Sequence, residues 1–140
     1  MKKTTLIVSA LLITYNLFAQ GIVYSSCDHC WDADSLGNHR FVIHSQKASQ
    51  GNAVHVIIPW RRRDDNPEMK RVIIEDAQTQ KRISNVFIKN ISKESGDIFF
   101  QPVSGNGNYN VYYMPYKNEG RSNYPRGVYL QPDITYSNDW

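Results

Sequence analysis

The chain has 140 residues, a formal net charge of +3 and two cysteines. This length is sufficient for one domain with a hydrophobic core, and it excludes a complete (β/α)8-barrel enzyme, which needs about 250 residues. Two of the positive charges are Lys2 and Lys3, and without them the net charge falls from +3 to +1. The basic composition therefore does not indicate a nucleic-acid partner.

The first 19 residues have the pattern of a cleavable signal peptide. The two lysines precede an apolar stretch from Leu6 to Phe18, and the small Ala19 stands where a signal peptidase would cut, before Gln20. The apolar stretch is short for a membrane span, and an uncleaved N-terminal anchor is the alternative. A lipoprotein is disfavoured, because Tyr24-Ser25-Ser26 precedes the first cysteine in place of the small, apolar motif required for lipid attachment.

This pattern predicts a periplasmic or extracellular protein with no membrane span after cleavage. We expect three parts: a signal peptide at 1–19, an N-terminal lead at 20–38 and one β domain at 39–140.

Cys27 and Cys30 form a CxxC pair in this lead. A redox site would place such a pair at the start of a helix, but no helical pattern follows. Haem attachment requires a histidine directly after the second cysteine, and a tryptophan stands there. A zinc site would need two more ligands, which could come from His39, His44 or His55. We favour a local disulfide, or two spare thiols, in an oxidising compartment. We expect no metal site and no cofactor.

Residues 32–38 (DADSLGN) share part of the pattern of a calcium loop, with acidic residues at positions one and three and glycine at position six. Position twelve is Ile43, however, where calcium binding requires a bidentate glutamate. We therefore expect Asp32, Asp34 and Asn38 to hydrogen-bond nearby backbone amides instead.

The rest of the chain alternates β-type segments with turn residues. Segments rich in β-branched and aromatic residues are expected as strands at 39–45, 53–60, 71–75, 83–91, 97–103, 109–116 and 128–130. Ser104–Asn108 (SGNGN) gives the strongest hairpin signal, and 117–127 is expected to be a long loop. No convincing helix is predicted, although Pro67–Lys70 could open one.

The spacing of these strands predicts an all-β fold, an antiparallel β-sandwich of about seven to nine strands. The expected core residues are Ile57, Ile73, Phe87, Phe99 and Val111.

Two groups of residues could bind a carbohydrate. Trp60, Arg61, Arg62 and Arg63 could hold a carboxylated or sulfated ligand, because the arginine fork matches such groups. The adjacent Asp64 and Asp65 favour the alternative, in which structural ion pairs hold a corner between strand and loop or the segment packs against a partner domain.

The second group consists of tyrosines in the last third of the chain. Exposed rings there could stack on sugar rings, but a tyrosine-rich core or domain interface is the expected arrangement. Tyr112 and Tyr113 must point to opposite sides of a sheet, so at least one of them is expected in the core. The tyrosines in question are Tyr109, Tyr112, Tyr113, Tyr116, Tyr124, Tyr129 and Tyr136.

No catalytic residue is predicted. The sequence has no nucleophile elbow, zinc-protease motif, phosphate-binding loop or dinucleotide fingerprint. Its acidic pairs lie in loops without an evident proton partner.

Three stretches carry a family resemblance: 31–40 (WDADSLGNHR), 58–68 (IPWRRRDDNPE) and 97–116 (DIFFQPVSGNGNYNVYYMPY). They resemble the N-terminal β-sandwich domain of glycoside hydrolase family 123, found in secreted bacterial glycan-degrading enzymes. The resemblance implies an enzyme that removes terminal β-linked N-acetylgalactosamine, with the substrate's acetamido group as nucleophile beside an Asp–Glu pair. That pair belongs to a following barrel domain, so no catalytic residue is carried over to this chain.

The resemblance implies a non-catalytic accessory domain, which we expect to be a truncated fragment of a larger hydrolase. Its expected partner is the catalytic barrel domain or a glycan. The alternative is a free-standing, secreted carbohydrate-binding module.

Overall fold

The fold is described from a computed structural model, which covers residues 22–26, 30–46, 48, 51–121, 123, 126–133, 135–137 and 139. The predicted signal peptide, Cys27 and Tyr124 lie outside these residues. No helix within the described ranges is long and apolar enough to cross a membrane.

The described residues form nine strands, one short α-helix and one 3-10 turn, which confirms the all-β prediction. Most strands occupy segments predicted from the sequence, with boundaries shifted by a few residues. The strands are β1 (Ile22–Ser26), β2 (His39–Ser45), β3 (Val54–Pro59), β4 (Val72–Asp76), β5 (Val86–Ile91), β6 (Ser95–Phe100), β7 (Gly107–Tyr113), β8 (Tyr116–Glu119) and β9 (Arg126–Tyr129); the helix α1 spans Ala33–Leu36 and the 3-10 turn η1 spans Pro67–Met69.

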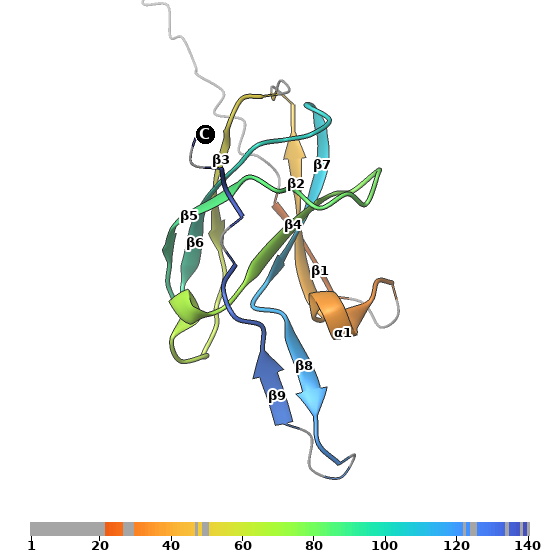
Figure 1. Ribbon diagram of the computed structural model, residues 1–140, viewed down its shortest axis with the longest axis vertical. Helices are drawn as coiled ribbons and strands as arrows, with labels where there is room; N and C mark the ends of the chain where they lie inside the picture. Colours follow the sequence, from red (N-terminus) through yellow and green to blue (C-terminus); the bar gives the residue numbers. More distant parts are fainter. Residues whose placement is uncertain are drawn as a thin grey trace, which may run out of the picture.

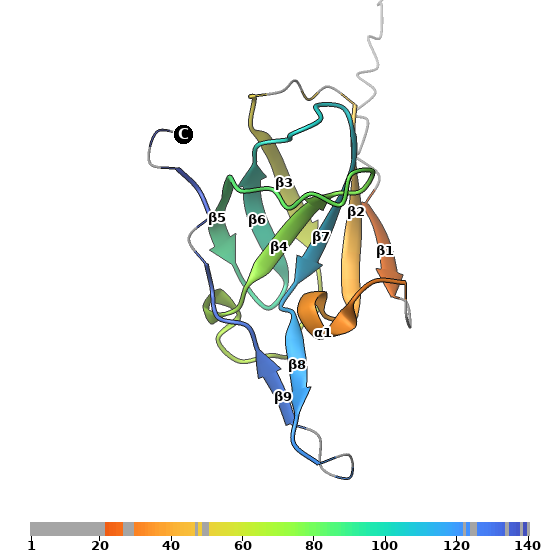
Figure 2. The same ribbon diagram turned by 45° about the vertical axis from the view of Figure 1, so that its right-hand side comes forward.

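Two antiparallel sheets face each other as a sandwich (Figure 1). One sheet has the strand order β1-β2-β7-β4 and the other has the order β3-β6-β5. A separate hairpin of β8 and β9 projects from one end of the sandwich, and both views show it extending away from the two sheets (Figures 1 and 2). β9 leads back towards the sandwich, and the chain after it continues in the same direction along β5 towards the opposite end (Figure 2).

The core follows from the two-residue period of the strands. In β3, Val54, Val56 and Ile58 point inwards and are buried, whereas the residues between them are exposed. Inward side chains from β2, β6 and β7 meet them from both sheets. The fully buried core side chains of these three strands include Phe41, Ile43, Ile98, Phe100, Tyr109 and Val111.

The predicted hairpin at Ser104–Asn108 is wrong. This segment joins β6 to β7, and the register places β6 between β3 and β5 but β7 between β2 and β4. The turn therefore crosses from one sheet to the other. Gly105 and Gly107 adopt positive φ values of 73° and 154° there, and the buried Tyr109 hydroxyl donates to the Gly105 carbonyl oxygen at 2.6 Å. The glycine and asparagine residues correctly indicate a turn at this point, but they do not indicate which strands pair.

Two further segments contain more structure than predicted. The expected loop at 117–127 belongs largely to the β8–β9 hairpin, in which Tyr116 pairs with Tyr129. The lead at 20–38 contributes β1, an edge strand paired with β2, and also α1. Asp32 caps α1: its carboxylate accepts hydrogen bonds from the Asp34 amide at 3.1 Å and from the Ser35 hydroxyl. The hydrogen bond from Ser35 lowers the pKa of Asp32.

Three of the five predicted core residues need correction. Ile73 and Val111 are buried, whereas Ile57 is 57% exposed, Phe87 is 39% exposed and Phe99 is only half-buried. The strands themselves were predicted, but for these three residues the inward face was assigned incorrectly. A one-residue error in phase moves a side chain to the opposite face of a sheet. The consequence is an unexpected group of apolar side chains on the outer surface.

Candidate functional site

Trp60, predicted as part of a carbohydrate site, lies in the core with 4% of its surface exposed. Its ring is nearly parallel to that of Tyr113, with centroids 5.1 Å apart, and it also stacks on Phe41 at 6.2 Å. The indole Nε1 donates to the Ser92 carbonyl oxygen at 2.8 Å. A Cβ atom at Gly96 would overlap this ring, so the glycine permits its close approach. The Trp60 ring is therefore not presented to a ligand.

The three arginines next to Trp60 differ in their burial and in their ion pairs. Arg62 is partly buried, and its Nε donates to Asp64 Oδ2 at 2.6 Å. Asp64 also accepts a hydrogen bond from the Tyr129 hydroxyl, and Lys70 Nζ lies 3.9 Å from its Oδ1. This ion-pair cluster joins the corner after β3 to the base of the β8–β9 hairpin. This arrangement matches the alternative predicted from the sequence, in which ion pairs hold the corner between strand and loop.

Arg61 and Arg63 are exposed, and neither forms an ion pair within the described part of the chain. Their predicted role in binding a glycan stays a prediction.

Cys30 is disulfide-bonded. Because Cys27 lies outside the described residues, the predicted bond between Cys27 and Cys30 stays a prediction. Among the residues described, no group of three or more histidine, cysteine or acidic side chains is arranged to hold a metal ion.

A row of exposed and half-buried rings lies on the outer side of the three-stranded sheet. His55 on β3, Phe99 on β6 and Phe87 on β5 are aligned by the strand register. Tyr136, from the segment that follows β9, continues the row, and Ile57 lies two residues beyond His55 on the same side of β3. We call these five residues the aromatic face.

Along the row, each ring of the aromatic face contacts the next one. His55 stacks on Phe99, with centroids 4.2 Å apart and an interplanar angle of 10°. Phe99 contacts Phe87 at 6.2 Å with a tilt of 45°, and Phe87 meets Tyr136 edge-on at 5.5 Å. Ala53, Phe87, Phe99 and Tyr136 line a shallow hollow of about 370 Å³ in this surface. The result is a contoured apolar surface whose rings differ in orientation.

A small charged group borders the aromatic face. Asp97 lies between His55 and Lys89: its Oδ1 is 2.6 Å from His55 Nε2, and its Oδ2 is 3.2 Å from Lys89 Nζ. The hydrogen bond with His55 lowers the pKa of Asp97, and the nearby Lys89 lowers it further. The carboxylate thus remains ionised at neutral pH and fixes the orientation of the His55 ring that stacks on Phe99.

The outer side of the four-stranded sheet has aromatic residues too, but they are covered. Trp31 lies against Tyr112 with centroids 5.8 Å apart, and the Arg40 guanidinium lies 4.4 Å above the Trp31 ring. Tyr112 is 2% exposed and hydrogen-bonds to Glu75. Burial raises the pKa of Glu75, partly offset by Arg82 and Tyr112. Trp31 and Arg40 cover Tyr112, so among the described residues the aromatic side chains on this side form no exposed row.

Sequence reasoning missed the aromatic face because it assigned Ile57, Phe87 and Phe99 to the core. A signal was present in β3, where His55 and Ile57 alternate with three valine and isoleucine residues. A strand with apolar residues on both of its faces predicts one of two arrangements. Either both faces are buried, or one face is buried and the other contacts a partner. The choice between these two depends on tertiary structure, and the described residues place no further sheet or helix over the outer side of this sheet.

The comparisons agree with the resemblance noted in the sequence. Residues 29–140 match the family described as Glycoside hydrolase 123, N-terminal domain. Comparison with curated proteins and with solved structures finds no match. The family match extends over most of the chain and includes the strands β2 to β9 that build the sandwich. The chain therefore belongs to the family of glycoside hydrolase 123 N-terminal domains, which makes it an accessory domain of a glycoside hydrolase.

Proposed function

We propose that this chain is the non-catalytic accessory domain of a secreted glycoside hydrolase that acts on glycans containing N-acetylgalactosamine. We further propose that the aromatic face contacts the catalytic barrel domain of that enzyme. Family membership supports the accessory role, and the exposed aromatic face is the single observation that carries the contact. Exposed apolar surface of this kind commonly marks an interaction site.

The geometry of the rings favours a protein partner over a sugar. A sugar ring stacks on the open face of an aromatic side chain, but His55 already covers one side of Phe99. Phe87 meets its neighbours tilted or edge-on, so the rings do not share one plane. Ile57, which is 57% exposed, adds an aliphatic contact that packs well in a protein interface.

The path of the chain favours the catalytic domain as the partner. The family comprises N-terminal domains, so a catalytic domain would follow this one in the complete enzyme. The last described segment runs beside β5, where the Thr135 hydroxyl donates to the Val86 carbonyl oxygen at 3.0 Å. Tyr136 in this segment belongs to the aromatic face. A domain following this segment would therefore begin next to that face.

Complex formation tests the contact. The chain is mixed with the catalytic domain of a family 123 enzyme, encoded beyond or beside it in the same genome, and the mass of the complex is measured by light scattering. We expect a one-to-one complex that Phe87→Ser and Ile57→Lys weaken by about tenfold or more, because each removes apolar area from the interface. Val23→Ser is the matched control, since Val23 is at least as exposed as Ile57 and Phe87 but lies on the edge strand of the other sheet. Failure to form a complex, or equal weakening by the control, would contradict the proposal.

Activity tests the non-catalytic role. The chain alone should release no N-acetylgalactosamine from a β-linked chromogenic substrate, and the same assay with the catalytic domain should show release. Measurable release by the isolated chain would overturn the proposed accessory function.

Secretion has its own test. N-terminal sequencing of the exported product should show a chain that begins near Gln20. An intact Met1 in the soluble cytosolic fraction would contradict the predicted export.

A further inference from the structure

A second hollow, here called the edge hollow, lies where β1 and β3 come together. Each of these strands is the outermost described strand of its sheet, so the hollow is on the opposite edge of the sandwich from the C-terminal segment beside β5. Its volume of about 410 Å³ is within the range of small-molecule sites, about 300–1,000 Å³. The residues that line it are Tyr24, Pro59, Trp60, Arg61 and Glu94.

Tyr24 presents an exposed ring to the edge hollow, and this ring is held in place. The side chain is 57% exposed, and its hydroxyl donates to the Pro59 carbonyl oxygen of the other sheet at 2.6 Å. The ring also meets Phe41 of the core in an edge-to-face contact, with centroids 4.6 Å apart. A ring that is fixed before binding loses little conformational entropy when a ligand stacks on it. Tyr24 is therefore a suitable platform for the apolar side of a ligand.

Arg61 and Glu94 place groups of opposite charge beside this ring. The Trp60 amide donates to the Glu94 carbonyl oxygen at 2.8 Å, which brings Glu94 next to the segment that follows β3. Both charged side chains are exposed, and neither forms an ion pair with any residue that the structure describes. The guanidinium can donate hydrogen bonds and the carboxylate can accept them. Together they suit a ligand that accepts and donates hydrogen bonds and has no net charge.

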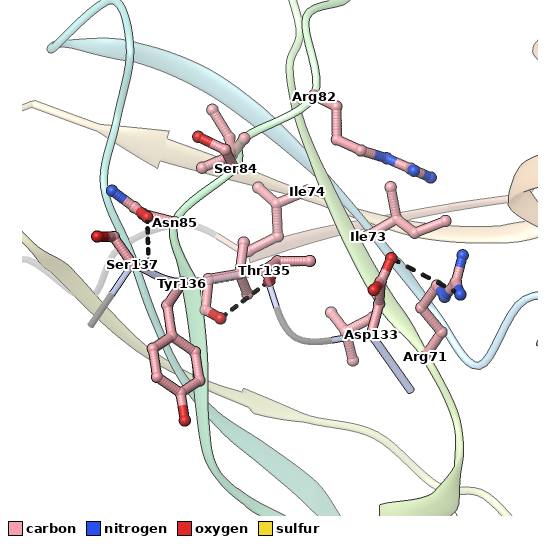
Figure 3. A pocket seen from close by; sticks show the side chains of 13 residues that line it. Arg71, Ile73, Ile74, Arg82, Ser84, Asn85, Asp133, Thr135, Tyr136 and Ser137 are labelled. Carbon is pink, nitrogen blue, oxygen red and sulfur yellow. Dashed lines mark hydrogen bonds and ion pairs between the residues drawn. The ribbon is translucent and has the colours of Figure 1, made fainter. Parts of the chain in front are cut away.

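The larger cleft beside β4, drawn in Figure 3, is a weaker candidate for a ligand site. Two of the residues that line it, Ile73 and Ile74, are 3% and 0% exposed, so they offer almost no surface to a ligand. Arg71 at this cleft is already paired with Asp133 at 3.7 Å, as a dashed line in Figure 3 marks. The edge hollow, in contrast, combines an exposed ring with two polar groups that have no ion-pair partner among the described residues.

We propose that the edge hollow binds one uncharged sugar unit of a glycan. The C–H face of the sugar ring stacks on Tyr24, and the sugar hydroxyls accept hydrogen bonds from Arg61 and donate them to Glu94. The ring and the pair of opposite charges are the reasons for a neutral sugar. The choice of N-acetylgalactosamine as that sugar rests on the proposed function. In this way the accessory domain holds the glycan on which its catalytic domain acts.

NMR titration of the full exported chain tests this site. The probes are the methyl glycosides of N-acetylgalactosamine, galactose and glucose, with N-acetylgalactosamine 6-sulfate as a charged comparison. Tyr24→Ala removes the ring, Arg61→Ala removes the donor, and Glu94→Ala removes the acceptor. Arg63→Ala and Phe87→Ser are the controls, because Arg63 is an exposed arginine that does not line the edge hollow and Phe87 belongs to the aromatic face.

We expect at least one neutral sugar to shift the resonances of β1 at about 10 mM or less. Tyr24→Ala, Arg61→Ala and Glu94→Ala should each weaken this binding about tenfold, because they remove the stacking surface or a hydrogen bond to a charged group. The two controls should leave the binding unchanged. The sulfated sugar should bind no more tightly than the neutral one, since the charges of Arg61 and Glu94 offset each other.

The proposal is overturned if no neutral sugar binds, if the sulfated sugar binds more tightly, or if Phe87→Ser abolishes the binding. Normal binding by Glu94→Ala would also overturn it, and this exposed position keeps the test valid if Tyr24→Ala disturbs the fold. Binding of galactose or glucose without N-acetylgalactosamine would support the site and contradict the substrate in the proposed function. The contact with the catalytic domain is measured separately, so each proposal can fail on its own.

Discussion

Two groups of aromatic rings in this domain have similar chemistry and opposite surroundings. Trp60, Tyr113 and Phe41 stack between the two sheets, where Trp60 and Phe41 are buried and the indole nitrogen has a hydrogen-bond partner. His55, Phe99 and Phe87 form contacts just as close, but on the outer side of the three-stranded sheet, over which the described residues place no further layer.

The difference shows that ring contacts alone do not identify a core. The inner stack contributes to the free energy of folding because its rings leave water when the chain folds. The outer row leaves much of its apolar area in water in the isolated domain. Its area can instead contribute to the free energy of binding a partner. Substitutions in the two groups should therefore affect different measurements.

The largest effect is expected in the inner stack. Trp60→Ala should lower the free energy of unfolding by about 3–5 kcal/mol, because it leaves a cavity and removes the hydrogen bond from Nε1 to the Ser92 carbonyl oxygen. Gly96→Ala should also destabilise the domain, because its new methyl group would overlap the Trp60 ring. Urea denaturation measures both. A loss below about 1 kcal/mol for Trp60→Ala would contradict the assignment of this stack to the core.

Asp76 and Asp97, which lie apart from each other, extend the comparison of buried and exposed groups to two carboxylates. Asp76 is 3% exposed, and its Oδ1 accepts hydrogen bonds from the Gln78 and Thr79 amides at 3.0 and 2.8 Å. Asp76→Ala should cost about 1–3 kcal/mol, because these donors lose a buried partner. Asp97→Asn, on the border of the aromatic face, should change the free energy of unfolding much less than Asp76→Ala, because surface substitutions usually have small effects. Equal effects in urea denaturation would contradict the contrast.

The pH dependence of Asp76 has a definite sign. Burial by itself would raise its pKa, but the hydrogen bonds from Thr79, Ser104 and Gln78 outweigh burial and lower the pKa in the folded state. The stabilisation is therefore present above the unfolded pKa, which lies near 4, and is lost as the pH falls through the folded pKa. Measured between pH 6 and pH 2, the acid-induced loss of stability should be smaller in Asp76→Asn than in the unchanged chain. If both chains lose the same stability between pH 6 and pH 2, Asp76 is not responsible for the acid-induced loss.

The smallest effect on folding is expected at the aromatic face. Phe87→Ser should change the free energy of unfolding by about 1 kcal/mol or less, since the side chain is 39% exposed. It should nevertheless reduce the binding of an apolar fluorescent dye by the isolated domain. A destabilisation comparable to that of Trp60→Ala would show that Phe87 belongs to the folding core.

Much of the fold could be predicted from the sequence because strand propensity and turn residues are local properties. His39–Ser45 was located to the residue, and β3 and β4 to within one residue at each end. The pairing of strands could not be predicted in this way. The turn at Ser104–Asn108 has the residues of a hairpin, yet it joins two sheets, since pairing depends on contacts between distant segments.

The site could be predicted less well than the fold. Trp60 next to three arginines has the composition of a ligand site, but its ring fills the space above Gly96, 36 residues further along the chain. Conversely, Phe87 and Phe99 are residue types expected in a core, but the described structure places no layer over the outer side of their sheet, which leaves Phe87 exposed and Phe99 half-buried. Both assignments depend on tertiary packing that a local pattern does not contain.

The measurement that tests the central proposal most directly is hydroxyl-radical footprinting of the chain with and without the catalytic domain. This method reports the solvent accessibility of individual side chains. We predict that Ile57, Phe87 and Tyr136 become protected in the complex, while Val23 and Tyr24, which are similarly exposed on the edge strand of the other sheet, stay reactive. Protection of Val23 and Tyr24 with no change at the aromatic face would contradict the account.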